Sequence, residues 1–301
     1  MTPNPYPIAL SNRRLTILAW ITTILISTMP DILFDLISGG VPGWLVYAKM
    51  GLLGLMIALA VFWKTLRPLL RFLIIMVCFF GMMELRTRLD FTWPALQKLF
   101  GQNVFDSRMQ AEQTGKLAIS LLIIGLLLIM GYKFRDIFLK CGDLKAPMEP
   151  VKLLGFPKVE PWPKFALIYG FGIAGFLAVL QFFSLRPSGE VLCQVVPILP
   201  SILFYAALNA FNEEYTFRAP MLATLEPIGG SKHALWMAAF FFGIAHYFGT
   251  PGGIIGGLLS IFMGWILGKA MVETRGGFWA WWIHFLSDVA IFIFLTTTLI
   301  K

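Results

Sequence analysis

Long apolar segments recur along the whole chain, and they limit its possible folds more than any other feature. A helix needs roughly 20 apolar residues to cross the hydrocarbon core of a bilayer, which is about 30 Å thick. Hydrophobic residues make up 58% of the 301 residues and charged residues only 13%, which is too apolar for an ordinary soluble domain. No succession of roughly 10-residue alternating strands is present. We therefore expect an all-α, polytopic transmembrane helix bundle.

The apolar segments predict eight or nine membrane spans. We expect the first segment to remain as an uncleaved helix, because many spans follow it and no small-residue cleavage site is clear. The candidate spans are Leu15–Met29, Trp44–Trp63, Phe72–Met83, Leu117–Tyr132, Phe165–Phe183, Val195–Arg218, Lys232–Phe248, Gly253–Val272 and Phe278–Leu299. The stretch Glu84–Lys116 has mixed charge, and we expect it to lie at the outer interface rather than to cross.

The net charge of +8 is explained by basic residues that lie between the apolar segments. Lys and Arg are enriched in cytoplasmic loops of membrane proteins, so Arg13 and Arg14 before the first segment predict a cytoplasmic N-terminus. We interpret the charge as membrane topology and attraction to anionic lipid, and we expect no nucleic-acid partner. The compact architecture and the lack of an organelle signal favour an integral protein of a bacterial plasma membrane.

A basic, proline-rich stretch divides the chain. Residues 133–164 hold seven basic side chains, four acidic ones and five prolines, which is typical of a cytoplasmic linker. We thus predict N-terminal transmembrane helices over residues 1–132, the linker over 133–164, and over 165–301 a C-terminal transmembrane bundle that carries the candidate catalytic site.

Glu213, Glu214 and Arg218 lie in a segment otherwise suited to a bilayer. Ionised groups at membrane depth are costly and usually functional. In a helix, Glu214 and Arg218 are one turn apart and can neutralise each other. Another face of the same helix carries a stripe of polar residues: Asn209, Asn212, Glu213 and Thr216. Glu214 and Arg218 point away from this stripe, and we expect Glu213 to face a polar environment.

Two later spans add further candidate site residues: Phe242 and His246 are four residues apart on one, and His284 and Asp288 on the other. A glutamate removed from water is a stronger base, and a neighbouring histidine can share in activating a water molecule. A second histidine can donate a hydrogen bond to an oxyanion, with Asp288 orienting it. Attack of water on a peptide carbonyl would use all four groups.

Spacing alone leaves three functions open, namely hydrolysis, a proton relay in a transporter, and polar contacts that hold helices together. Two histidines and a glutamate also match a catalytic zinc ligand set, but no HExxH motif is present. A GxSxG nucleophile elbow is absent as well. The three cysteines are scattered without a CxxC motif and are expected to be free.

The motifs EExxxR at Glu213, FxxxH at Phe242 and Hxxx(N/D) at His284 occur in this order, each on its own apolar segment. In these residues the chain resembles the CAAX protease and bacteriocin-processing (CPBP) family, which includes the Rce1-type intramembrane endopeptidases. The resemblance covers about the C-terminal third of the chain. It implies a helical membrane protease of the glutamate type that acts on a membrane-associated peptide or protein.

The resemblance also implies roles for individual residues. Glu213 and His246 would position the attacking water, and His284 with the residue at 288 would line the oxyanion site. Glu214, Arg218, Phe242 and Asn209 are expected to support them. An asparagine at 288 would offer an amide donor, whereas Asp288 must be protonated to donate; otherwise it serves only to orient His284. We expect no cofactor, with zinc as the less favoured alternative.

The helix that carries Glu213 must continue past Pro220 to about Leu225. If it ended before Pro220, Glu213 would lie only about 9 Å from that end, while His246 would lie about 21 Å into the returning helix. The two side chains would then miss each other in depth. A catalytically idle scaffold or regulator with a membrane-protein partner, or a proton-coupled transporter, is the alternative function.

Overall fold

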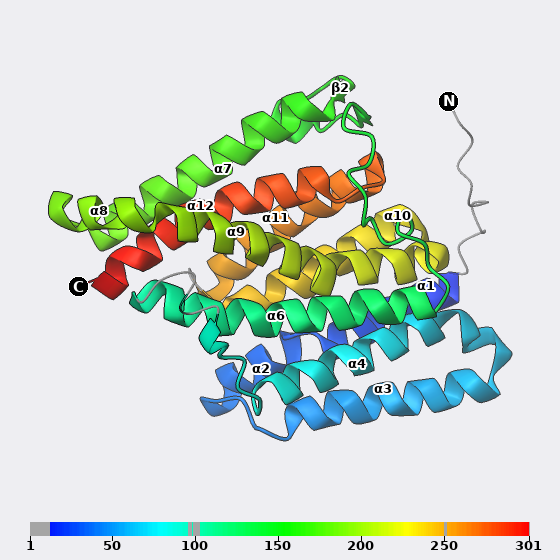
Figure 1. Ribbon diagram of the computed structural model, residues 1–301. Helices are drawn as coiled ribbons and strands as arrows, with labels where there is room; N and C mark the ends of the chain where they lie inside the picture. Colours follow the sequence, from blue (N-terminus) through cyan, green and yellow to red (C-terminus); the bar gives the residue numbers. More distant parts are fainter. Residues whose placement is uncertain (1–12, 96–97, 99–102, 250–251, 301) are drawn as a thin grey trace.

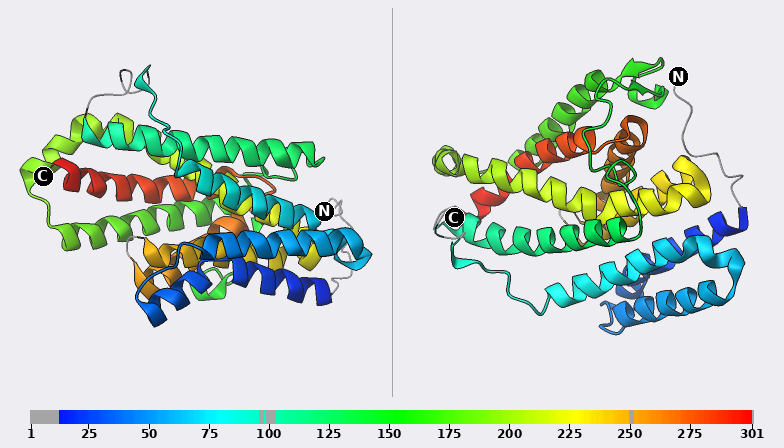
Figure 2. Two further views of the ribbon diagram at one scale, coloured as in Figure 1. Left: turned by 90° about the horizontal axis from the view of Figure 1, so that it is seen from below. Right: turned by 45° about the vertical axis from the view of Figure 1, so that its right-hand side comes forward.

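The computed structural model describes residues 13–95, 98, 103–249 and 252–300. These residues form a bundle of helices, and the axes of most of these helices are roughly aligned in all three views (Figures 1 and 2). In Figure 1, α3 lies at one edge of the bundle and α7 at the opposite edge. The predicted all-α polytopic architecture is confirmed.

The N-terminal helices are α1 (Arg13–Ile26), α2 (Met29–Ser38), α3 (Leu45–Phe62), η1 (Lys64–Leu69), α4 (Leu70–Arg86) and α6 (Val104–Ile129). The expectation that residues up to Lys116 lie at the outer interface is wrong for α6, which begins at Val104. The Asn103 side chain caps this helix by accepting a hydrogen bond of 2.9 Å from the Asp106 backbone N–H. Its polar residues Gln110 and Gln113 are buried against protein. Residues 96–97 and 99–102 of the predicted interfacial stretch lie outside the described part of the chain.

Residues 133–164 are packed against the bundle. Strands β1 (Pro147–Met148) and β2 (Glu160–Pro161) pair antiparallel around η2 (Lys152–Leu154), at the start of α7 (Trp162–Leu185; Figure 1). Trp162 is fully buried, and its indole N–H donates to Oε2 of Glu273 at 2.9 Å. This stretch is therefore tied to the end of α11.

The C-terminal elements are α8 (Gly189–Val195), η3 (Val196–Ile198), α9 (Leu199–Glu213), η4 (Glu214–Arg218), α10 (Ala219–Ile244), η5 (Ala245–Phe248), α11 (Gly253–Thr274) and α12 (Phe278–Ile300). Element η4 is a π-helical turn, and the helix passes from it through Pro220 into α10 without a break. Pro220 lacks the backbone N–H that a continuous helix would use, and it comes directly after the π-helical turn, where the hydrogen bonds already depart from the α-helical pattern.

The prediction that this helix continues past Pro220 is confirmed, and the break falls at Gly230. There φ is 78° and ψ is 167°, a conformation that glycine adopts readily. Glu213 precedes Gly230 by 17 residues and His246 follows it by 16. These separations correspond to about 25 Å and about 24 Å of helix. The two side chains therefore lie at similar depths.

Among the described residues, 7 helices are long and apolar enough to cross a membrane, or 8 if α1 and α2, bent by 44°, form one span. The longest candidate, Gly189–Phe248, has 60 residues and would measure about 90 Å as a straight helix. This is about three times the hydrocarbon thickness, so the break at Gly230 separates two crossings. Counted in this way, the spans reach the predicted eight or nine.

Close packing of α10 on α11 depends on glycines. A Cβ atom at Gly243 would lie 2.2 Å from the backbone N of Ile261, and one at Gly264 would lie 3.2 Å from the Cα of Ala239. Small residues let membrane helices approach closely, and Gly243 of α10 and Gly264 of α11 do so here. The contact fixes the part of α10 that leads to His246.

Candidate active site

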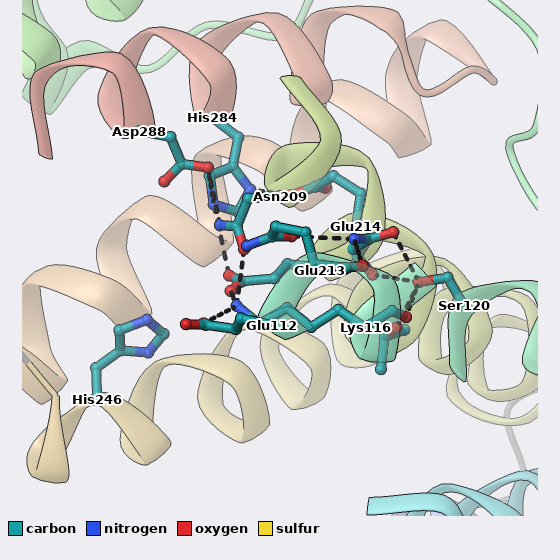
Figure 3. Close-up of polar contacts among 12 residues, drawn as sticks. Glu112, Lys116, Ser120, Asn209, Glu213, Glu214, His246, His284 and Asp288 are labelled. Atoms are coloured by element: carbon teal, nitrogen blue, oxygen red, sulfur yellow. Dashed lines mark hydrogen bonds and ion pairs between the residues drawn. The ribbon is translucent and has the colours of Figure 1, made fainter. Parts of the chain in front are cut away.

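Five elements supply the polar side chains of the candidate site, which are drawn in Figure 3. Glu213 ends α9 and Glu214 begins η4, so the two glutamates lie where the α-helix becomes a π-helix. His284 projects from α12 and Lys116 from α6. His246 is in η5, beyond the end of α10.

Glu213 is held between α6 and α12. Its Oε1 accepts a hydrogen bond of 2.9 Å from Nζ of Lys116, and its Oε2 lies 3.6 Å from Nε2 of His284. A cavity of about 30 Å³ borders Glu213, Lys116, Asn212 and Thr216. This is space for at least one water molecule, although Met83, Ile119 and Phe217 also line the cavity and its wall is mostly apolar. The structure thus leaves a small space beside the predicted base.

Glu214 holds the imidazole of His284. Its Oε1 lies 2.8 Å from Nδ1 of His284, and the carboxylate also pairs with Arg218, as the sequence predicts. Glu214 and Arg218 are fully buried, and the guanidinium lies over the Phe242 ring at 4.7 Å. Because an ionised carboxylate can only accept, Nδ1–H is the donor. Nε2 is thereby left facing Glu213 and Asp288.

Asp288 is not the group that holds His284 most closely. Its Oδ2 lies 3.7 Å from Nε2 of His284, which is farther than the 2.8 Å contact made by Glu214. Instead, Asp288 accepts a hydrogen bond of 2.9 Å from the Asn209 amide. The expected orienting contact is therefore made by Glu214, because that residue reaches the imidazole from the neighbouring helix.

His246 lies at the margin of the network. Its Nδ1 is 3.1 Å from the carbonyl oxygen of Phe242, and among the described residues it has no hydrogen bond or ion pair with Glu213 (Figure 3). The Phe242 ring contacts both histidines, with ring centroids 4.7 Å from His246 and 6.2 Å from His284. Phe242 therefore contacts both predicted catalytic histidines.

Helix α6 contributes polar groups that the sequence analysis missed. Gln113 and Lys116 both donate to Oδ1 of Asn209, at 2.8 and 2.7 Å. Ser120 lies 3.0 Å from the Thr216 hydroxyl. Gln113, Lys116 and Ser120 share one helix face, and this spacing matches that of Asn209, Asn212 and Thr216 on α9 and η4. This shared spacing could have identified the α6 residues from the sequence, but the mixed charge of the surrounding stretch led to its assignment to the interface.

These features define a class of protein: an integral membrane helix bundle with a buried site of carboxylates and histidines. Residues 195–290 match the family described as type II CAAX prenyl endopeptidase Rce1-like. The resemblance inferred from the three motifs is confirmed for this part of the chain, which holds Glu213, His246, His284 and Asp288. The match indicates an intramembrane protease. Neither a search of curated proteins nor a search of solved structures gave a match.

Proposed function

We propose that this protein is an intramembrane endopeptidase in which Glu213, together with His246, activates a water molecule to attack a peptide bond. The observation that carries the proposal is the meeting of Glu213, His284 and Asp288, with Nε2 of His284 3.6 and 3.7 Å from the two carboxylates. The substrate is a membrane-associated peptide or protein. The match of this region to an endopeptidase family supports the same activity.

The reaction begins with proton transfer from water to Glu213, and the water oxygen bonds to the substrate carbonyl carbon. Since Nδ1–H of His284 is held by Glu214, His284 donates to the oxyanion from Nε2 in its doubly protonated form. Its positive charge is balanced by Asp288 and, until Glu213 takes the proton, by Glu213 as well. When the tetrahedral intermediate collapses, the C–N bond breaks and the proton on Glu213 passes to the leaving amine.

The proposed mechanism uses no metal ion. Among the described residues, no group of three or more His, Cys, Asp or Glu side chains is placed to hold one. The Phe242 ring contacts each of the two histidines that would have to share a zinc ion. We expect cleavage to continue in a strong chelator. Loss of cleavage that added zinc restores would overturn this part of the proposal.

A catalytically idle scaffold of the same fold is the second candidate function. One observation favours it: Lys116 already occupies one oxygen of Glu213, while His246 has no direct contact with that carboxylate among the described residues. In this alternative, the polar network would serve only to hold α6, α9 and α12 together.

Cleavage of a peptide library by the purified full-length protein separates the two functions. We expect the wild type to cut and both Glu213→Ala and His246→Ala to lose activity, by about 10²- to 10⁴-fold for a general base. His233→Ala is the matched control, because His233 is exposed and hydrogen-bonded to Trp20, away from the site. Unchanged cleavage in both site variants would overturn the mechanism, and a wild type that cuts nothing would favour the scaffold.

A further inference from the structure

Lys116 is part of the candidate site although it lies outside residues 195–290, the region that matches the endopeptidase family. Its Nζ is 2.9 Å from Oε1 of Glu213 and 2.7 Å from Oδ1 of Asn209. Glu112, one turn earlier on α6, is farther away, at 3.4 Å. Figure 3 shows the lysine extending from α6 across to these groups. The site is therefore incomplete without the N-terminal helices.

The charged groups around Glu213 indicate what Lys116 contributes to the site. Glu112, Glu213, Glu214 and Asp288 bring four carboxylates to the site, and Arg218 is already paired with Glu214. Arg86 of α4 borders the small cavity but forms no ion pair with Glu213 among the described residues. Lys116 is thus the permanent cation that contacts Glu213, and through the Asn209 amide it is connected to Asp288.

The geometry also distinguishes the two oxygens of Glu213. Lys116 binds Oε1, whereas Oε2 faces His284 at 3.6 Å and has no hydrogen bond within the described part of the chain. A carboxylate tethered through one oxygen cannot rotate freely about its terminal torsion, so its second oxygen keeps a fixed direction. A fixed direction matters because reacting atoms must meet at about 3–3.5 Å with aligned orbitals.

We propose that Lys116 is a positioning residue for the catalytic glutamate: it anchors Oε1 of Glu213, supplies the compensating charge, and leaves Oε2 to take the proton from water. This inference rests on the proposed endopeptidase function. It predicts that the charge of the side chain at position 116, and not only its volume, is required for turnover.

The test compares kcat and KM for Lys116→Met, Lys116→Arg and Arg108→Met, using the full-length protein and a peptide that the wild type cuts. Methionine has a similar length without charge, so we expect kcat to fall by about 10²-fold with KM within about twofold. Arginine retains the cation, and we expect it to recover most of the rate. Arg108→Met is the matched control, because it removes an exposed cation from the same helix, two turns before Lys116.

Thermal unfolding and size-exclusion chromatography show whether each variant is folded. If Lys116→Met does not fold, the arginine variant still decides, because a folded but inactive Lys116→Arg protein overturns the inference. A wild-type kcat in folded Lys116→Met, with Glu213→Ala inactive, refutes the role of Lys116 and leaves the proposed function intact. Full activity in Glu213→Ala refutes the role of Glu213 as the base and this inference with it, whereas a wild type that cuts no peptide refutes the proposed function.

Discussion

Two of the lysine–carboxylate pairs inside the described part of the bundle differ in their surroundings. Lys49 of α3 pairs with Asp31 of α2, and Lys116 of α6 pairs with Glu213. Both are largely shielded from solvent, with side chains 8% and 19% exposed in the first pair and 23% and 16% in the second. The Asp31–Lys49 pair borders the larger cavity, of about 310 Å³, which is lined mainly by Val41, Val46, Phe80 and Phe248.

The comparison shows that neither a buried charge nor a large cavity is enough to identify a site. Among the described residues, the hydrogen bonds of the Asp31–Lys49 pair end with the pair itself. The Glu213–Lys116 pair is connected to Asn209 and, through it, to Asp288, and it adjoins His284. A pair of the first kind holds two helices together, whereas the second kind brings groups that exchange protons into one place.

The largest expected effect comes from removing one carboxylate charge from each pair. Glu213→Gln keeps the shape of the side chain but cannot accept a proton, so kcat/KM should fall by about 10²- to 10⁴-fold. Asp31→Asn should leave kcat/KM within about twofold. Both values are measured with the same peptide substrate. A comparable loss in Asp31→Asn would contradict this distinction between the two pairs and would indicate that the substrate reaches the larger cavity.

A measurement of stability tests the structural role of the Asp31–Lys49 pair. Lys49→Met leaves the half-buried Asp31 without its partner, which should lower the free energy of unfolding by about 1–3 kcal/mol. The double variant Asp31→Asn/Lys49→Met removes both charges and should regain most of this loss. Unfolding is followed in detergent micelles. If the double variant is as unstable as Lys49→Met, the pair stabilises the fold by more than the mutual neutralisation of its two charges.

The smallest effect is expected at the edge of the Glu213 network. Ser120 donates to backbone oxygens and lies 3.0 Å from the Thr216 hydroxyl, and none of its hydrogen bonds within the described residues involves Glu213 or Glu214. Ser120→Ala should lower the free energy of unfolding by about 0.5–1.5 kcal/mol and reduce turnover less than Lys116→Met. The exposed Ser38→Ala serves as the control. A larger loss of turnover would extend the catalytic network along α6.

The sequence predicted the parts of the site that depend on helical spacing. Residues four apart lie on the same helix face, so the pairs Glu214–Arg218 and Phe242–His246 could be placed before the fold was known. The continuation of the helix past Pro220 followed from the need to bring Glu213 and His246 to equal depth. Each of these inferences needed only the geometry of a single helix or of two successive helices joined by a turn.

The rest depended on contacts between distant helices. No local pattern shows that Glu214, rather than Asp288, holds Nδ1 of His284, because the choice is decided by how α9 and α12 pack. Lys116 was missed for a different reason: the charged residues around it lowered the hydropathy of a stretch that the structure shows as one continuous helix. Polar residues that face protein lower hydropathy as much as those that face water.

The π-helical turn at Glu214–Arg218 also bears on how this chain should be aligned with related sequences. A π-turn holds one more residue than an α-turn, and each added residue rotates the preceding helix by about 100° and moves it by about 1.5 Å. A relative that lacks the extra residue would direct its glutamates to different neighbours, even if the motif letters could be matched. An alignment that forbids a one-residue gap here would therefore pair side chains that occupy different faces.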